Sequence, residues 1–167
     1  MKKQLLKCIE IGKDLFMKLN KNLSVASLDK RLWDVFSLYI RLRDTNKDGY
    51  GQCITSGAWR HYTSFDCGHG IGRQHFCTKY DEKNNHCQSK RENGFEEGNK
   101  SIYSKKVDNL YGDGTWAELE QRSKGSCKKV KFYFLEKIPE YQQKIRELMK
   151  SKNFELAKNY HTRLNWK

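Results

Sequence analysis

Histidine and asparagine recur in the middle of the chain, between Cys53 and Asn99, and they follow short turn sequences in the order His69, Asn84 and Asn93. Hydrolysis of a phosphodiester with one metal ion needs a neutral imidazole that takes a proton from water, oxygen or nitrogen ligands for a divalent cation, and a residue that fixes the imidazole tautomer. These residue types at these separations meet those needs if two short strands carry the first histidine and a helix carries the last ligand. The spacing therefore indicates metal-dependent hydrolysis as the candidate chemistry.

Helices are expected before this segment. Residues 1–28 have apolar residues at roughly helical spacing, which predicts one basic helix. A second helix follows, with Ser27 or Asp29 as its cap, because apolar residues recur at i, i+3, i+4 and i+7 from Leu32 to Ile40. This second helix would lead directly into the segment that carries the histidines.

The middle and the end of the chain differ in pattern. Residues 50–99 lose the helical period and alternate short aromatic or β-branched pieces with turn residues, which predicts short strands and loops. From residue 100 onward the helical period returns, with Pro139 near the first turn of one helix and a last helix from Ser151 towards Leu164. The predicted fold class is α+β. Its parts are an N-terminal basic helix over residues 1–27, a core with its leading helix over 28–99, and a basic helical region over 100–167.

The charge of the chain points to a polyanionic partner. Its 167 residues carry 33 Lys and Arg against 20 Asp and Glu, a formal charge of +13. By segment, the net charge is +4 over residues 1–28, +1 over 29–99 and +8 over 100–167. Such a surplus attracts polyanions and makes binding sensitive to salt, so nucleic acid is the leading partner, with a basic surface kept for solubility as the alternative. We expect the flanks to supply the affinity, and a truncation after Glu120 to lose binding.

A run of lysines in the C-terminal region is the main candidate for binding nucleic acid. It consists of Lys124, Lys128, Lys129 and Lys131, and it leads into Phe132, Tyr133 and Phe134. Lysines beside aromatic rings can bind phosphates and stack on unpaired bases. The same pattern also fits a solvated edge beside a core strand, and both interpretations stay open.

Six cysteines and the absence of a long apolar run limit the cellular location. The chain has no stretch of about 18 apolar residues, and its first residues lead into an amphipathic segment rather than the apolar core of a signal peptide. A cytoplasmic protein without membrane contact is therefore expected. In a chain long enough to build its own core, the cysteines are interpreted as free thiols or metal ligands rather than as disulfides.

Five short segments carry an ordered set of motifs. They are LDKRLW at residues 28–33, YIRLRD at 39–44, GHGIGR at 68–73, TKYDEKN at 78–84 and GN at 98–99. Taken in order, they resemble the NinG/Rap family of phage recombination nucleases over well more than half of the chain, and the set is more specific than any single motif. The resemblance implies a small HNH-like, ββα-metal core flanked by helices. It also implies an endonuclease in the cytoplasm of a bacterial host that acts on branched DNA, such as Holliday junctions or D-loops.

The resemblance implies catalytic roles for three residues. His69 would be the general base that activates water, Asn84 would brace the metal loop, and Arg73 would meet the scissile phosphate, where a planar guanidinium can stabilise the charge that builds up. Resolving a junction takes two cuts related by symmetry, which is the geometry of a homodimer.

The same resemblance implies a catalytic Mg²⁺ or Mn²⁺ ion. Asn93 would be a metal ligand at the start of a helix, with Asp66 and His86 as weaker additions. In many HNH sites an acidic residue directly before the first histidine also binds the metal, but that position is Gly68 here. Asp66 would therefore have to supply its oxygen from a different place on the backbone.

The chain departs from the family at a structural zinc site. Family members bring two C-x2-C pairs together, whereas this chain keeps Cys53 and has Ser56, Ser89 and Glu92 at the other three positions. Serine is a poor zinc ligand, so the structural Zn²⁺ is expected to be lost, with a substitute site built from other cysteines as a minor alternative. The alternative function is a non-catalytic DNA-binding protein on a degenerate HNH fold.

Overall fold

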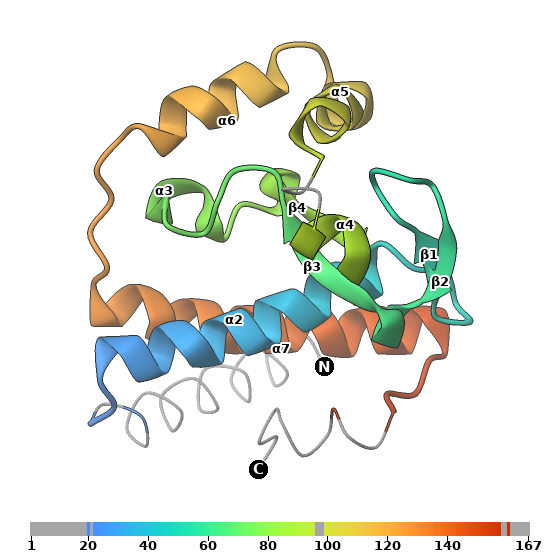
Figure 1. Ribbon diagram of the computed structural model, residues 1–167. Coiled ribbons are helices and arrows are strands. Elements are labelled where there is room, and N and C mark those ends of the chain that lie inside the picture. The colour runs from blue at the N-terminus through green and yellow to red at the C-terminus, as the bar shows by residue number, and fades with distance from the viewer. Residues whose placement is uncertain (1–19, 21, 96–98, 158–159, 161–167) are drawn as a thin grey trace.

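Two long helices lie side by side, with two small sheets and the shorter helices stacked on one side of the pair (Figure 1). The computed structural model describes residues 20, 22–95, 99–157 and 160, so the helix predicted over residues 1–27 lies largely outside the described residues. Helices together with short strands confirm the α+β class. None of the helices described is both long enough and apolar enough to cross a membrane.

Helix α2 (Val25–Arg43) is the central element of the core. It begins where the Ser24 side chain accepts a hydrogen bond from the Ser27 backbone N–H at 3.1 Å, so the cap is Ser24 and neither Ser27 nor Asp29. Its apolar side is buried, as the periodicity predicted. The buried stripe includes Leu28, Leu32, Val35, Phe36, Tyr39 and Ile40.

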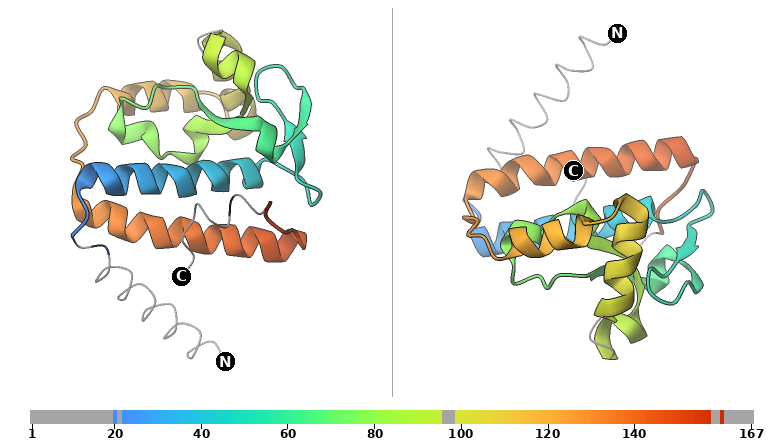
Figure 2. Two further views of the ribbon diagram at one scale, coloured as in Figure 1. Left: turned by 60° about the horizontal axis from the view of Figure 1, so that its bottom comes forward. Right: turned by 90° about the horizontal axis from the view of Figure 1, so that it is seen from above.

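Helix α7 (Lys131–Lys152) packs against α2, and both helices run in the same direction (Figure 2). The buried apolar residues of the two helices form one hydrophobic cluster. The predicted core segment over residues 28–99 and the C-terminal region over 100–167 therefore share a single core. The contribution of α7 consists of Phe134, Leu135, Ile138, Tyr141 and Ile145.

Two predictions about the C-terminal helices are wrong. Pro139 lies inside α7 rather than near its first turn, although an interior proline costs about 3 kcal/mol. The helix continues because Ile138 and Ile145, on either side of the proline, are fully buried against α2, and each such burial contributes about 1.5 to 3 kcal/mol. The chain then leaves the helix at Asn153, whose left-handed φ of 49° ends it, so residues 153–157 are not helical and no helix begins at Ser151. Beyond residue 157, the predicted range lies outside the described residues except for Tyr160.

Two antiparallel strand pairs precede a short helix. Strand β1 (Tyr50–Gln52) pairs with β2 (Trp59–His61), and β3 (Phe65–His69) pairs with β4 (Asn85–Ser89). Helix α4 (Lys90–Phe95) follows β4 without a break. The segment of residues 50–99 thus contains the short strands that its pattern predicted.

The remaining elements are short and lie around the β3–β4 pair. They are the 3-10 turns η1 (Tyr62–Ser64) and η2 (Glu82–Asn84) and the helices α3 (Phe76–Lys79), α5 (Lys100–Tyr111) and α6 (Thr115–Ser123). Helices α5 and α6 cover the loop after β3 with a second, smaller cluster (Figure 1). This cluster consists of Ile71, Tyr103, Val107 and Leu119.

A disulfide joins Cys77 of α3 to Cys127 in the connection between α6 and α7. The prediction of free thiols or metal ligands is therefore wrong for this pair, because the connection passes α3 and brings the two Cα atoms to 5.3 Å. Cys53, Cys67 and Cys87 are buried free thiols.

Candidate functional site

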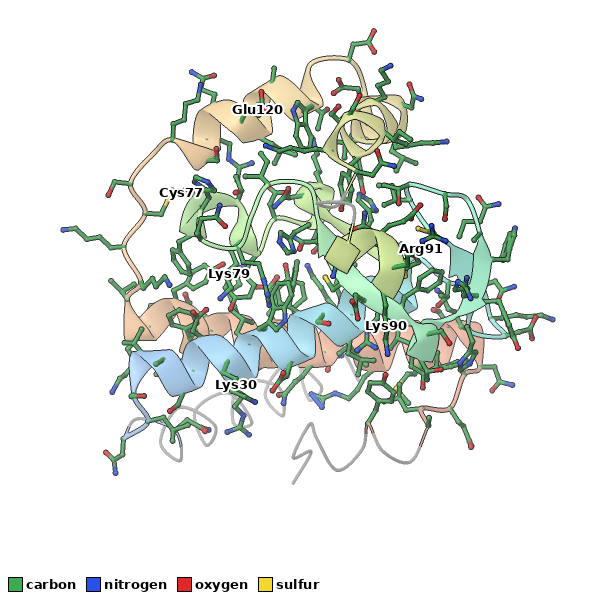
Figure 3. The ribbon with its side chains drawn as sticks, in the orientation of Figure 1. Lys30, Cys77, Lys79, Lys90, Arg91 and Glu120 are labelled. Carbon is green, nitrogen blue, oxygen red and sulfur yellow. A yellow bond between two sulfur atoms is a disulfide. The ribbon has the colours of Figure 1, made fainter. Side chains whose placement is uncertain are left out.

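A cavity of about 410 Å³ opens between α2, β3 and α4, within the size range of small-ligand sites. Figure 3 shows Lys90 at the start of α4 beside β3, on the same face of the molecule as Lys30 of α2. Among the described residues that line the cavity, cations outnumber carboxylates. The polar and aromatic lining includes Trp33 and Arg41 from α2, Asp66 and His69 from β3, Arg73 from the following loop, and Lys90 and Asn93 from α4.

His69 is the last residue of β3 and lines this cavity. Its Nδ1 is buried and has no hydrogen-bond partner among the described residues. Burial, and then the nearby charge of Arg73, lower the imidazole pKa below its ordinary 6.5, because both disfavour the protonated form. At neutral pH the ring is therefore uncharged and able to accept a proton, as a general base requires.

Arg73 reaches the cavity from the loop after β3. Its guanidinium lies over the Trp33 ring, 5.0 Å from the centroid, in a cation–π contact that orients an exposed side chain. A planar guanidinium in this position can make paired hydrogen bonds to phosphate oxygens. The structure thus brings Arg73 and His69 to the same cavity.

Asp66 and Asn93 also meet in this cavity. The Asn93 Nδ2 donates a hydrogen bond to the Asp66 Oδ2 at 3.1 Å, which orients both side chains. The other carboxylate oxygen and the amide oxygen are ligands of the kind that Mg²⁺ and Mn²⁺ prefer, so the donor set fits such an ion. The described part of the chain gathers no group of three or more His, Cys, Asp or Glu side chains that could hold a metal ion.

Asn84 lies outside the cavity and holds the loop that carries Arg73. It is fully buried in η2, where its Oδ1 accepts a hydrogen bond from the Ile71 N–H at 2.8 Å. Its Nδ2 donates to the carbonyls of Ile71 and Thr78, each at 3.0 Å. These bonds fix the loop on both sides of Arg73. Asn84 is thus a positioning residue for the Arg73 loop, whereas the resemblance implied that it braces the metal loop.

His86 is not part of this cavity, contrary to the expectation that it joins the metal ligands. It lies on β4 opposite Gly68, with its Nδ1 at 3.2 Å from the Asp44 Oδ2 and 3.0 Å from a terminal nitrogen of Arg43. Burial acts to raise the pKa of the Asp44 carboxyl, but the hydrogen bond from His86 and the charge of Arg43 lower it to about 2. His86 is thus engaged in a buried polar network at the end of α2.

The four positions that the motif resemblance pairs with zinc ligands do come together, around the carboxylate of Glu92. The Cys53 thiol donates to the Glu92 Oε2 at 2.8 Å and the Ser89 hydroxyl at 3.4 Å. The hydroxyls of Thr55 and Ser56 also bond to this carboxylate. Burial acts to raise the pKa of Glu92, but these hydrogen bonds lower it below its ordinary 4.5, so the side chain stays ionised. We call these five residues the Glu92 network; it ties the turn after β1 to the start of α4.

The lysines predicted to bind nucleic acid lie outside the cavity, in the connection between α6 and α7 and at the start of α7. The aromatic residues that follow these lysines, Phe132, Tyr133 and Phe134, lie in α7 and not in a core strand, so the interpretation as a strand edge is wrong. The Lys129 ammonium lies 3.6 Å from a carboxylate oxygen of Asp29 on α2. The four residues are Lys124, Lys128 and Lys129, all exposed, and the half-buried Lys131.

Sequence reasoning missed the side of α2 that faces the cavity. Trp33, Ser37 and Arg41 recur every four residues, so they form one stripe on the helix. An aromatic, a hydroxyl and a cation at that period could have identified this stripe. Tyr160, which also lines the cavity, is far away in sequence and gives no such signal.

Comparison with models of known protein families, with curated proteins and with solved structures finds no match for this chain. Its function must therefore be inferred from the residues of the cavity. A neutral imidazole, two oxygen ligands and a guanidinium around one cavity are the groups that metal-assisted hydrolysis of a phosphodiester needs.

Proposed function

We propose that this chain is a metal-dependent DNA endonuclease that cuts branched recombination intermediates, such as Holliday junctions or D-loops. The observation that carries the proposal is one cavity that collects a neutral histidine, a carboxylate paired with an amide, and an arginine. The order of strand, strand and helix around these groups supports the proposal, because it is the order of the ββα-metal core that the motifs imply. The preference for branched DNA rests on the motif resemblance. The four residues are His69, Asp66, Asn93 and Arg73.

In the proposed reaction, the His69 imidazole takes a proton from a water molecule, and the hydroxide formed attacks the phosphorus while the P–O bond to the leaving sugar oxygen breaks. Solvent water then protonates the leaving oxygen. Arg73 donates hydrogen bonds to the non-bridging oxygens, on which negative charge increases in the transition state. Asp66 and Asn93 would hold a Mg²⁺ or Mn²⁺ ion, which when bound supplies Lewis-acid stabilisation of that charge. Asn84 keeps the loop of Arg73 in place.

Basic residues outside the cavity would supply most of the affinity for DNA. The exposed lysines of the connection between α6 and α7 belong to a C-terminal region that carries +8 of the total charge of +13. Each phosphate neutralised by such a lysine releases condensed counterions, so the affinity should fall steeply as salt increases.

The test compares the protein with a His69→Ala variant on a labelled four-way junction and a linear duplex, each with Mg²⁺ and with a chelator. We expect metal-dependent cleavage that falls by about 10²- to 10⁴-fold in His69→Ala, the usual contribution of a general base. His75→Ala is the matched control. His75 caps α3 outside the cavity, with its Nδ1 3.1 Å from the Ser123 carbonyl oxygen, so this variant should keep its activity.

Each outcome bears on a different part of the proposal. Cleavage by His69→Ala at the rate of the unchanged protein would contradict the role of this histidine. DNA binding without cleavage by either protein would favour the non-catalytic DNA-binding protein. Equal cutting of junction and duplex would keep the nuclease and remove the preference for branched DNA. The paired cuts of a junction also lead us to expect a homodimer, which sedimentation of the protein with and without DNA would detect.

A further inference from the structure

A second arginine lies in the cavity and takes no part in the chemistry proposed above. The Arg41 Nη1 donates to the Tyr160 hydroxyl at 2.8 Å, and its Nε donates to the Ser37 carbonyl at 3.1 Å. The guanidinium also stacks on the Tyr160 ring, 5.1 Å from the centroid. These contacts hold the side chain in one place but use only two of the five N–H donors of a guanidinium. Arg41 therefore keeps donors for a further acceptor in the cavity.

Among the described residues, no carboxylate forms an ion pair with either arginine of the cavity. Within the part of the chain that the structure describes, Arg41 and Arg73 form no ion pair, and both make cation–π contacts instead. Arg43 and Arg122, which lie outside the cavity, do pair with carboxylates, at 2.7 Å and 2.6 Å. Two oriented and unneutralised guanidinium groups in one cavity indicate an anionic ligand that touches both.

The spacing of the two arginines indicates how long this ligand is. Arg73 lies over Trp33, whereas the Arg41 guanidinium is held at the Ser37 carbonyl, one turn further along α2, a rise of about 6 Å along the helix. One strand of a DNA duplex advances about 3.4 Å per nucleotide, so this rise corresponds to about two nucleotides. Successive phosphates of one strand can therefore contact both groups. Cys67, two residues before His69 on β3, lines the same cavity as both arginines, which places β3 beside the same stretch.

We propose that the cavity holds one DNA strand lengthwise along α2, with Arg41 and Arg73 bound to successive phosphates of that strand beside His69. The ligand class is thus a strand with at least two successive phosphates. The position of the strand beside His69 rests on the proposed function, but the two phosphate contacts do not depend on cleavage. Tyr160 is the positioning residue for Arg41, as Trp33 is for Arg73.

The test measures equilibrium binding of a labelled single-stranded oligonucleotide in chelator, where the proposed cleavage cannot occur, over a range of salt concentrations. We expect Arg41→Gln and Arg73→Gln each to lower the slope of log affinity against log salt by about 0.7, and the double variant by about 1.4. The matched control is Arg60→Gln, which removes the same charge from an exposed residue of β2 outside the cavity. Its slope should stay that of the unchanged protein. A slope for Arg41→Gln equal to that of the unchanged protein or of Arg60→Gln would overturn the proposal.

A second variant keeps the proposal testable if Arg41→Gln does not fold. Tyr160→Phe removes the hydroxyl that holds the guanidinium but keeps the ring and every charge. We expect it to weaken oligonucleotide binding by about fivefold, the effect of one lost hydrogen bond, with an unchanged salt slope. Tyr111→Phe, in a tyrosine whose hydroxyl lies 3.4 Å from His86 outside the cavity, should bind normally. Unchanged affinity in Tyr160→Phe would count against the proposal.

The binding and cleavage experiments can fail separately. If the salt slope falls in Arg41→Gln but no DNA is cut, the strand site stands and the nuclease does not. If DNA is cut but Arg41→Gln keeps its slope, the nuclease stands and the placement of the strand along α2 is wrong.

Discussion

Breaking the Cys77–Cys127 disulfide should destabilise the protein next to the candidate site. Cys77 lies in α3, four residues after Arg73, and Cys127 lies among the exposed lysines of the connection between α6 and α7. The bond therefore ties the basic connection to the element that follows the Arg73 loop. Its loss should leave α2 and α7 packed, because their shared cluster does not include either cysteine.

The size of the effect follows from the length of chain that the bond closes. The two cysteines are separated by 50 residues. In the chain-entropy relation, closing a loop of this length lowers the entropy of the unfolded chain by about 14 cal/mol/K, which corresponds to about 4 kcal/mol at 25 °C. A domain of ordinary stability has only about 5 to 15 kcal/mol in total, so the loss would be easy to measure.

The assay is urea unfolding followed by tryptophan fluorescence, for the protein with and without reductant and for the Cys77→Ser, Cys127→Ser double variant. We expect reduction and the double substitution to lower the free energy of unfolding by the same amount, and reductant to have no further effect on the variant. Thiol titration of the denatured protein should reveal two additional thiols after reduction. No additional thiols, or equal stability with and without reductant, would refute the reasoning.

Three other perturbations test the Glu92 network, the loop that Asn84 holds and the proposed general base His69. The Glu92 pKa is lowered in the folded state, so the stabilisation by its carboxylate is complete above pH 4.5 and is lost as the pH falls through the folded-state pKa. In urea unfolding at different pH values, Glu92→Gln should therefore make the free energy of unfolding less dependent on pH in this acid range. Asn84→Ala should lower the free energy of unfolding by about 2 to 3 kcal/mol in the same assay, because it leaves the Ile71 N–H unpaired, and unchanged stability would contradict its bracing role. Cleavage should decline as the pH falls through a pKa below 6.5, and Arg73→Gln should move this inflection to higher pH, since removing the charge favours the imidazolium; an unmoved inflection would show that the two groups are not coupled.

Local patterns predicted the elements, and tertiary packing decided their limits. The apolar period of residues 32–40 was sufficient to predict α2, because that helix buries the stripe that the period describes. The prediction that Pro139 lies near the first turn of a helix was wrong for the opposite reason, since the burial of its neighbours against α2 outweighs the local cost of proline. The pairing of Cys77 with Cys127 depends on how two distant segments pass each other, which no local pattern contains.

The candidate site was predictable where its residues are close in sequence to a turn or a strand. The order of His69 and Asn93 correctly predicted a strand for the first and a helix for the second. His86 contacts Asp44 because of its place in the register of β4, and no local pattern predicts that register. Arg41 was missed because its role depends on Tyr160, more than a hundred residues later in the chain.

The shared core also changes how DNA binding by the C-terminal region can be tested. A truncation after Glu120 would remove α7 and with it Phe134, Ile138 and Ile145 from the cluster around α2. Such a protein should unfold, so its loss of binding would say nothing about charge. Substitution of exposed lysines in the connection leaves the core intact and answers the question directly.

The Glu92 network has a consequence for how the protein becomes active in a cell. A site of four thiolates at these positions would need zinc to fold, so a shortage of zinc or a chelator would leave it unfolded. Hydroxyl and thiol donors around the Glu92 carboxylate come with the polypeptide itself, so this junction can close as soon as the chain is synthesised. We therefore predict that the protein folds without zinc, and that acid rather than a metal chelator destabilises this junction.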